Sequence, residues 1–129
     1  MLYTILPVLS SALIVICALE HVWFAILEGF LWRKPVGLRV FKMEAEKANA
    51  TWQLAANQGA YNAIFALGLL YGLFAQDLVV SHAFKFFFLI AIVIAGVVGG
   101  LTVNSRIMYI QALPAALAMV ILFIAESNS

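Results

Sequence analysis

The sequence predicts an all-α polytopic membrane protein, a bundle of four transmembrane helices with a basic cytoplasmic loop between the first two. Hydrophobic residues make up 66% of the 129 residues and charged residues only 10%, against about 45–50% and about 25% in soluble globular proteins. Four stretches are apolar over the roughly 20 residues that a helix needs to cross a bilayer. They are continuously apolar, whereas transmembrane β-strands alternate in polarity. Residues 1–129 are therefore expected to form a single transmembrane four-helix domain.

The first span is predicted over residues 5–30 and carries Glu20, His21 and Glu28. The second, residues 51–74, has no charge but contains several amide side chains. The third, residues 83–103, has Lys85 near its start. The fourth, residues 107–125, contains Pro114.

The long polar link between the first two spans, residues 32–50, is predicted to contain a turn and an interfacial helix. Pro35 and Gly37 are typical turn residues. Val40, Phe41 and Met43 alternate with charges, which favours an amphipathic helix that leads into the second span. The later links, residues 75–82 and the segment around Asn104, are short.

Positive charge fixes the expected orientation. Of the seven Lys and Arg residues, only Lys85 lies outside the first and third links; the others are Arg33, Lys34, Arg39, Lys42, Lys47 and Arg106. Because basic residues of short loops favour the cytoplasm, the 32–50 loop is predicted to be cytoplasmic and both termini outside.

Small residues recur every four positions in the second and third spans, as in Ala55, Gly59 and Ala63, or Ala95 and Gly99. This spacing permits close approach of membrane helices. We expect the second and third spans to form the tightest pair, although a partner helix from another chain fits the pattern as well. The tryptophans that bracket the long link are expected to lie at the membrane interface.

Polar residues of the spans gather in the predicted cytoplasmic half, which indicates a polar chamber open to the cytoplasm. Ionisable groups inside spans are costly and are functional candidates by default. The candidates for ligand binding or proton handling are Glu20, His21, Glu28, Asn57, Gln58, Tyr61, Asn62, Arg106 and Gln111.

Three roles are open for this cluster. Amides and carboxylates pair across helices and hold them together, and a glutamate of the first span paired with Arg106 would fit that role. Alternatively, the cluster binds a polar ligand or a proton through Glu20 and His21. Metal binding is not expected, because the cluster has one histidine and lacks the spacing of di-metal bundles. No cofactor is expected.

The segment 18–21 (Ala-Leu-Glu-His), Glu28, and the block 55–62 (Ala-Ala-Asn-Gln-Gly-Ala-Tyr-Asn) resemble the motifs of a small bacterial membrane family. The family is termed DUF1304 (domain of unknown function thirteen-oh-four), and the resemblance extends over essentially the whole chain, including Gln111 to Pro114. It implies four transmembrane helices and a bacterial source, and the expected location of the chain is the bacterial cytoplasmic membrane. It implies no activity.

The function expected from the residues is that of an integral membrane protein whose polar cluster binds or moves a small polar solute, ion or proton as a homo-oligomer. Two alternatives remain: a structural or accessory membrane subunit, and a membrane-embedded enzyme acting on a lipophilic substrate. Whether the chain is an enzyme is left open. The lipid bilayer is the expected partner. Nucleic acid is not an expected partner, because a net charge of +1 gives too little positive electrostatic potential to attract it.

Overall fold

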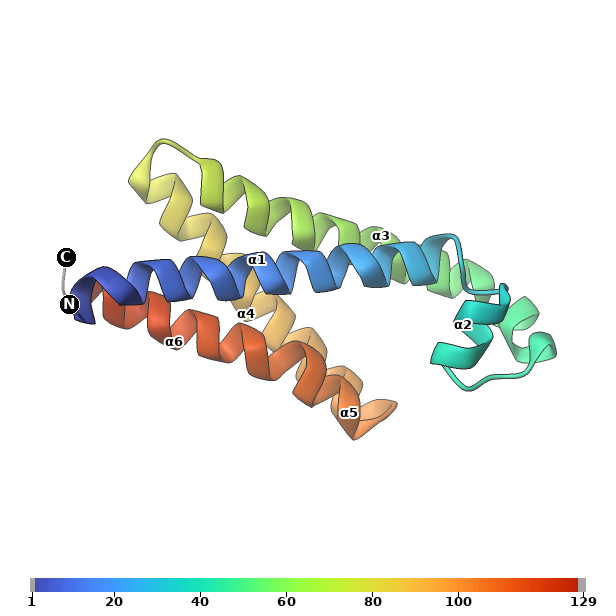
Figure 1. Cartoon of the computed structure of the whole chain (residues 1–129). Coiled ribbons are helices and arrows are strands. Elements are labelled where there is room, and N and C mark those ends of the chain that lie inside the picture. The colour runs from blue at the N-terminus through green and yellow to red at the C-terminus, as the bar shows by residue number, and fades with distance from the viewer. Residues whose placement is uncertain (1, 128–129) are drawn as a thin grey trace. The chain divides into compact units, whose positions relative to one another are not determined.

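The computed structural model describes residues 2–127, with side chains from residue 4 onward. Within this range the chain is helical and contains no strand, which confirms the all-α class. Figure 1 shows the elements, which in chain order are α1 (Leu2–Gly29), α2 (Pro35–Val40), α3 (Ala45–Phe74), α4 (Leu78–Thr102), α5 (Ser105–Ile107), the π-helix η1 (Met108–Ala112) and α6 (Leu113–Ser127).

Three helical segments are long and apolar enough to cross a membrane. They are Thr4–Gly29 of α1, Leu78–Thr102, which is α4, and the continuous segment Ser105–Ser127. Helix α3 is the longest, at 30 residues, but it is not among them, because the amides of Gln53, Asn57, Gln58 and Asn62 interrupt its apolar sequence. The chain therefore has the helices of a membrane protein, with three spans supported by length and composition.

The link between α1 and α3 differs from the prediction. Pro35 and Gly37, predicted to form a turn, lie in α2, where Pro35 occupies the start of the helix. Proline is favourable there, because its missing N–H is one that a first helical turn leaves unpaired anyway. Turns lie on both sides of α2: one over residues 30–34, and another between α2 and α3 that passes through Lys42 at φ 49°.

The segment predicted as an interfacial helix is also divided differently. Val40 ends α2, Phe41 and Met43 lie in the turn, and α3 already begins at Ala45, ahead of the predicted start of the second span. A proline-initiated helix followed by a tight turn thus replaces one continuous amphipathic helix.

Side-chain caps set the start of the later helices. Asp77 accepts a hydrogen bond at Oδ1 from the Val80 N–H at 2.9 Å, so α4 begins at Leu78, earlier than the predicted third span. Asn104 accepts likewise from the Arg106 N–H at 2.9 Å at the start of α5. Both residues satisfy N–H groups that a first helical turn leaves unpaired.

Proline explains the π-helix in the last span. Pro114 has no N–H, and in a regular α-helix its ring would collide with the carbonyl of Ile110. The chain widens locally instead, and the Leu113 N–H donates to the Met108 carbonyl five residues earlier. The helix thereby continues through Pro114 to Ser127.

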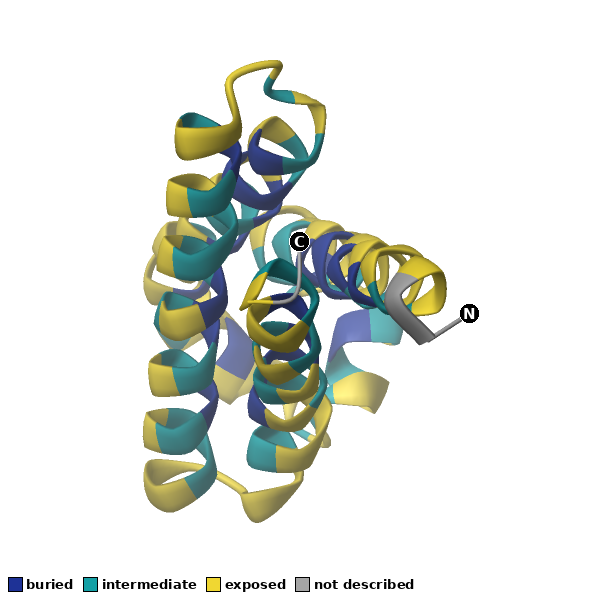
Figure 2. Cartoon of the chain, turned by 90° about the vertical axis from the view of Figure 1, so that its left-hand side faces the viewer, coloured by how far each residue is buried: buried dark blue, intermediate teal, exposed yellow. Residues whose placement is uncertain are grey.

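The chain divides into two compact units, residues 19–66 and residues 1–18 with 67–129. In the latter, a Cβ on Gly96 would lie 2.6 Å from the Ala112 backbone nitrogen, so α4 and η1 pack backbone to backbone. Gly72 lies against Phe84 and Lys85, and its carbonyl accepts from Ser81 Oγ at 2.7 Å. Gly72 of the second predicted span thus contacts the third span, and Gly96 of the third span contacts the fourth. The long helices carry buried residues on one side and exposed residues on the other (Figure 2).

Candidate functional site

Helix α1 carries three ionisable side chains within the unit formed by residues 19–66, namely Glu20, His21 and Glu28. His21 is fully buried, with its ring 5.6 Å from the Phe24 ring and 6.0 Å from the Phe65 ring. Glu20 is half-buried, and its Oε1 is buried without a hydrogen-bond partner among the described residues. An unpaired buried oxygen costs free energy, so this atom is a place where a bound proton or ligand would be stabilised.

The third ionisable group, Glu28, is held by a residue of α3. The Asn62 Nδ2 donates to Glu28 Oε2 at 2.6 Å, and Asn62 is buried. The two helices approach closely here because Gly59 has no side chain: a Cβ at that position would lie 2.9 Å from the Gly29 backbone nitrogen. The predicted neighbourhood of Glu28 and Asn62 is therefore a direct contact.

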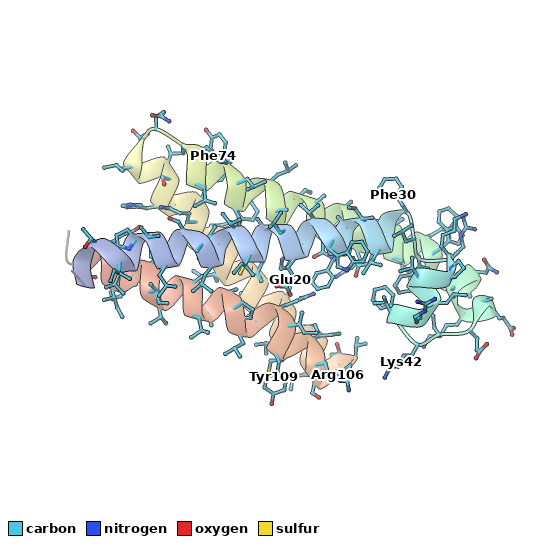
Figure 3. The ribbon with its side chains drawn as sticks, in the orientation of Figure 1. Glu20, Phe30, Lys42, Phe74, Arg106 and Tyr109 are labelled. Carbon is cyan, nitrogen blue, oxygen red and sulfur yellow. The ribbon has the colours of Figure 1, made fainter. Side chains whose placement is uncertain are left out.

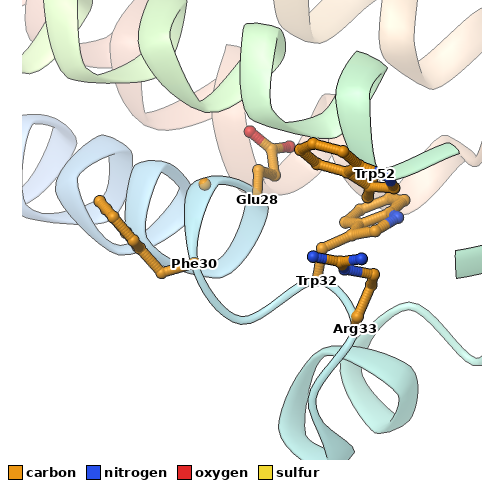
Figure 4. A pocket seen from close by; sticks show the side chains of 6 residues that line it. Glu28, Phe30, Trp32, Arg33 and Trp52 are labelled. Carbon is orange, nitrogen blue, oxygen red and sulfur yellow. The ribbon is translucent and has the colours of Figure 1, made fainter. Parts of the chain in front are cut away.

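A small polar cavity of about 100 Å³ lies beside Glu28, at the end of α1 (Figure 4). The Arg33 guanidinium carbon is 4.7 Å from the centre of the Trp52 ring, a cation–π arrangement. Trp32 Nε1 donates to Thr51 Oγ1 at 3.1 Å. The lining residues are Glu28, Gly29, Phe30, Trp32, Arg33 and Trp52.

Other predicted site residues on α3 face outward. Asn57 and Gln58 are exposed, and so is Tyr61. Only Asn62, on the neighbouring stripe of the same helix, is buried against α1. The amide-rich block therefore presents one buried and several exposed polar groups.

The last two predicted residues belong to the other unit. Arg106 is exposed and projects from α5, as Tyr109 does from η1 (Figure 3), and Gln111 is half-buried. Glu28 has Asn62 as its partner, and among residues 4–127 the structure gives Arg106 no ion pair.

Sequence reasoning missed the role of Arg33 and the two tryptophans as walls of one cavity. The sequence predicts Trp32 and Trp52 at the membrane interface and Arg33 in the cytoplasmic loop. Thr51, next to Trp52, is the partner that fixes Trp32. The sequence feature that could have predicted the cavity is the position of these residues: Trp32 and Arg33 follow the first predicted span, and Trp52 lies at the start of the second.

A second polar contact was also missed. His82 Nε2 lies 3.0 Å from Glu126 Oε1, joining the start of α4 to the end of α6. Because α4 and α6 are joined by a short turn, their far ends meet, and the sequence contains this information only through the lengths of the two helices. Within the described range, no three His, Cys, Asp or Glu side chains lie close enough together to hold a metal ion.

These features define a class: a small helical protein with membrane-length apolar helices and polar side chains buried along one of them. The chain belongs to the family described as "Protein of unknown function (DUF1304)", whose model matches residues 15–123. It is 34% identical over 122 residues to "Uncharacterized protein YpaA" of Lactococcus lactis subsp. lactis (strain IL1403), covering 91% of this chain and 96% of that protein. No solved structure matches.

Proposed function

We propose that the chain forms one four-span transmembrane domain of a bacterial cytoplasmic membrane that binds or moves a small polar solute, ion or proton. The observation that carries the proposal is the buried Oε1 of Glu20, which has no hydrogen-bond partner among the described residues. Glu20 follows the mostly apolar first part of α1, and the buried His21 and then Glu28 come after it in the same helix. Ionisable groups at such depth are costly and are retained in membrane spans chiefly for function.

In this proposal α3 also crosses the membrane, which raises the number of spans from three to four. Its amides lower its hydropathy, but Asn62 finds a partner in Glu28 at 2.6 Å, and such pairing reduces the cost of placing amides in a membrane. Charge supports the same reading: the link before α3 contains Arg33, Lys34 and Arg39, whereas the link after it contains Asp77. A crossing by α3 puts the 32–50 loop in the cytoplasm and both termini outside, as the charge rule favours.

A homo-oligomer is part of the proposal, because four helices of this length leave little room for a complete pathway in one protomer. The outward amides Gln53, Asn57 and Gln58 support it, since in a bilayer they need hydrogen-bond partners. Native mass spectrometry of protein released from nanodiscs measures the number of chains directly. A single defined oligomer is expected, and a monomer alone would contradict this part.

The transport reading is tested with protons as the probe. Reconstituted protein is expected to dissipate an imposed pH gradient faster than protein-free liposomes, as followed with a trapped pH-sensitive dye. Glu20→Gln removes the ionisable group but keeps the size of the side chain, so the flux should fall to the protein-free rate. Glu44→Gln, an exposed residue of the turn before α3, is the matched control and should keep the wild-type flux.

Equal flux in wild-type and Glu20→Gln liposomes would refute a role for Glu20 in proton movement. Failure of Glu20→Gln to fold or express, with Glu44→Gln unaffected, would instead favour a purely structural role for the cluster.

A structural or accessory subunit is the second candidate function, favoured by the exposed polar face of α3. Such a face fits docking to a different membrane protein as well as to a second copy. Its sign is stable co-purification with a different chain in fixed stoichiometry. Disruption of that complex by Asn57→Leu, with retained folding, would support this candidate over the homo-oligomer.

A further inference from the structure

The cavity at the end of α1 brings together an acidic and a basic side chain that do not form an ion pair with each other. Glu28 and Arg33 both line it, yet among residues 4–127 the structure gives neither an ion-pair partner within 4.0 Å. Glu28 accepts one hydrogen bond, from Asn62, at Oε2. The Arg33 guanidinium lies over the Trp52 ring, an arrangement that leaves its N–H groups available for an anion. The cavity is therefore complementary to a zwitterion.

Its walls are held in place before anything binds. Trp32 donates from Nε1 to Thr51 Oγ1 at 3.1 Å, and the Thr51 hydroxyl in turn donates to the Lys47 carbonyl at 2.8 Å. The Trp32 ring also packs 4.6 Å from the Phe41 ring, centre to centre. Figure 4 shows the indoles and the guanidinium on one side of the site, with Phe30 pointing away from them.

The volume limits the occupant. About 100 Å³ is well below the roughly 300–1,000 Å³ of pockets that enclose whole metabolites or drugs. A primary ammonium with its short carbon linker fits this space, while an attached phosphate would lie at the rim, toward Arg33 and the neighbouring exposed Lys34.

The cavity also lies where a lipid headgroup would be found. It is at the end of the apolar segment Thr4–Gly29, beside two tryptophans, a residue type enriched at membrane interfaces. Arg33, Lys34 and Arg39 follow it directly in the chain, and juxtamembrane basic residues attract lipid phosphates.

We propose that this cavity binds the phosphoethanolamine headgroup of a membrane phospholipid. The headgroup ammonium donates to the Glu28 carboxylate, and the phosphate accepts from Arg33. The ammonium must carry N–H donors to use Glu28 in this way, so a trimethylated headgroup is bound less well. A headgroup with phosphate but no ammonium leaves Glu28 unpaired. The inference rests on the proposed membrane insertion of α1, and it is independent of proton or solute movement.

The test is native mass spectrometry of the purified full chain with dilauroyl phosphatidylethanolamine, phosphatidylcholine or phosphatidylglycerol added at equal concentration. Wild-type protein is expected to retain phosphatidylethanolamine about tenfold more strongly than the other two, the effect of one well-formed charged contact. Glu28→Gln keeps an oxygen that accepts from Asn62, and it should abolish the preference over phosphatidylcholine. Arg33→Gln should weaken retention of all three lipids.

Glu44→Gln removes an exposed charge outside the cavity and should behave as wild type. Equal retention of the three lipids by wild-type protein would overturn the proposal, as would unchanged preference in Glu28→Gln. Free phosphoethanolamine is the remaining arm. If it binds as tightly as the lipid, the ligand is a soluble zwitterion and the lipid assignment is wrong.

The lipid-binding experiment and the proton-flux experiment together separate this inference from the proposed function. Wild-type protein that prefers phosphatidylethanolamine but carries no protons in liposomes would refute only the proton pathway. Wild-type protein that carries protons without any lipid preference would refute only the headgroup site.

Discussion

At the scale of single residues, one missing side chain decides whether two polar groups can meet. Gly59 lets α3 approach the end of α1, where a Cβ would lie 2.9 Å from the Gly29 nitrogen and 3.1 Å from the Ala25 carbonyl oxygen. Both neighbours are backbone atoms, which cannot rotate away. The hydrogen bond from Asn62 to Glu28 is made a few residues from this contact, so the geometry of the polar pair depends on the glycine.

Gly59→Ala should therefore destabilise the protein by about 1–3 kcal/mol, the usual cost of overpacking a tight site. The measurement is the thermal unfolding midpoint in detergent. Gly29→Ala is the matched control, because a Cβ there meets nothing within 4 Å and alanine favours a helix over glycine. A midpoint for Gly59→Ala equal to that of Gly29→Ala would contradict the proposed close packing.

Sequence reasoning could identify Glu28 and Asn62 as candidates, but not that they touch. Helical spacing places both residues on inward stripes of their helices, whereas the contact depends on the relative sliding of two helices, which Gly59 sets. Asn57 and Gln58 had the same signal in the sequence as Asn62, yet they are exposed. The spacing of residues along a helix predicts the direction in which each side chain points from the helix axis. It does not predict whether another helix lies in that direction.

At the scale of elements, the short helix α2 packs against the segment that carries two residues of the cavity wall, Trp32 and Arg33. Its Gly37 is buried, and a Cβ there would collide with the backbone carbonyls of Leu31 and Trp32. This contact seats α2 on the segment that carries Trp32 and Arg33. The sequence predicted a turn here because Pro and Gly are common in turns, but the same two residues also suit a helix start and a close backbone contact.

Gly37→Ala should lift α2 from the 31–32 segment and expose the link to proteases. Trypsin cleavage after Arg33, Lys34 or Arg39 is expected to become faster in detergent, while the midpoint of unfolding changes little. Val40→Ala alters an exposed side chain of the same helix and should be cleaved at the wild-type rate. An unchanged rate in Gly37→Ala would show that α2 does not depend on this contact.

At the scale of the whole molecule, the number of membrane spans depends on α3. Length and composition support three spans, and the fourth depends on the amides of α3 finding partners. The sequence predicts four spans from charge distribution and helix length. Hydropathy alone favours three, because it counts Asn62 as a cost and has no term for its bond to Glu28.

Single-cysteine labelling in intact cells decides between the two. In a Cys17→Ala background, Lys42→Cys should be protected from a membrane-impermeant maleimide and become reactive only after lysis. Gln76→Cys, in the link between α3 and α4, should react in intact cells. Equal reactivity of the two positions would mean that both ends of α3 lie on one side, and the four-span topology would be wrong.

The contact between His82 and Glu126, at 3.0 Å, has a mechanical consequence for the α4–α6 hairpin. The hairpin is closed by a short turn at one end and by this side-chain contact at the other. Tension applied at the C-terminal end of α6 would act first on the contact between His82 and Glu126, and it would reach the backbone contact of Gly96 with Ala112 only after that contact has broken. Helix α6 would then separate from α4 sequentially, starting at the end where His82 and Glu126 meet and moving toward the short turn.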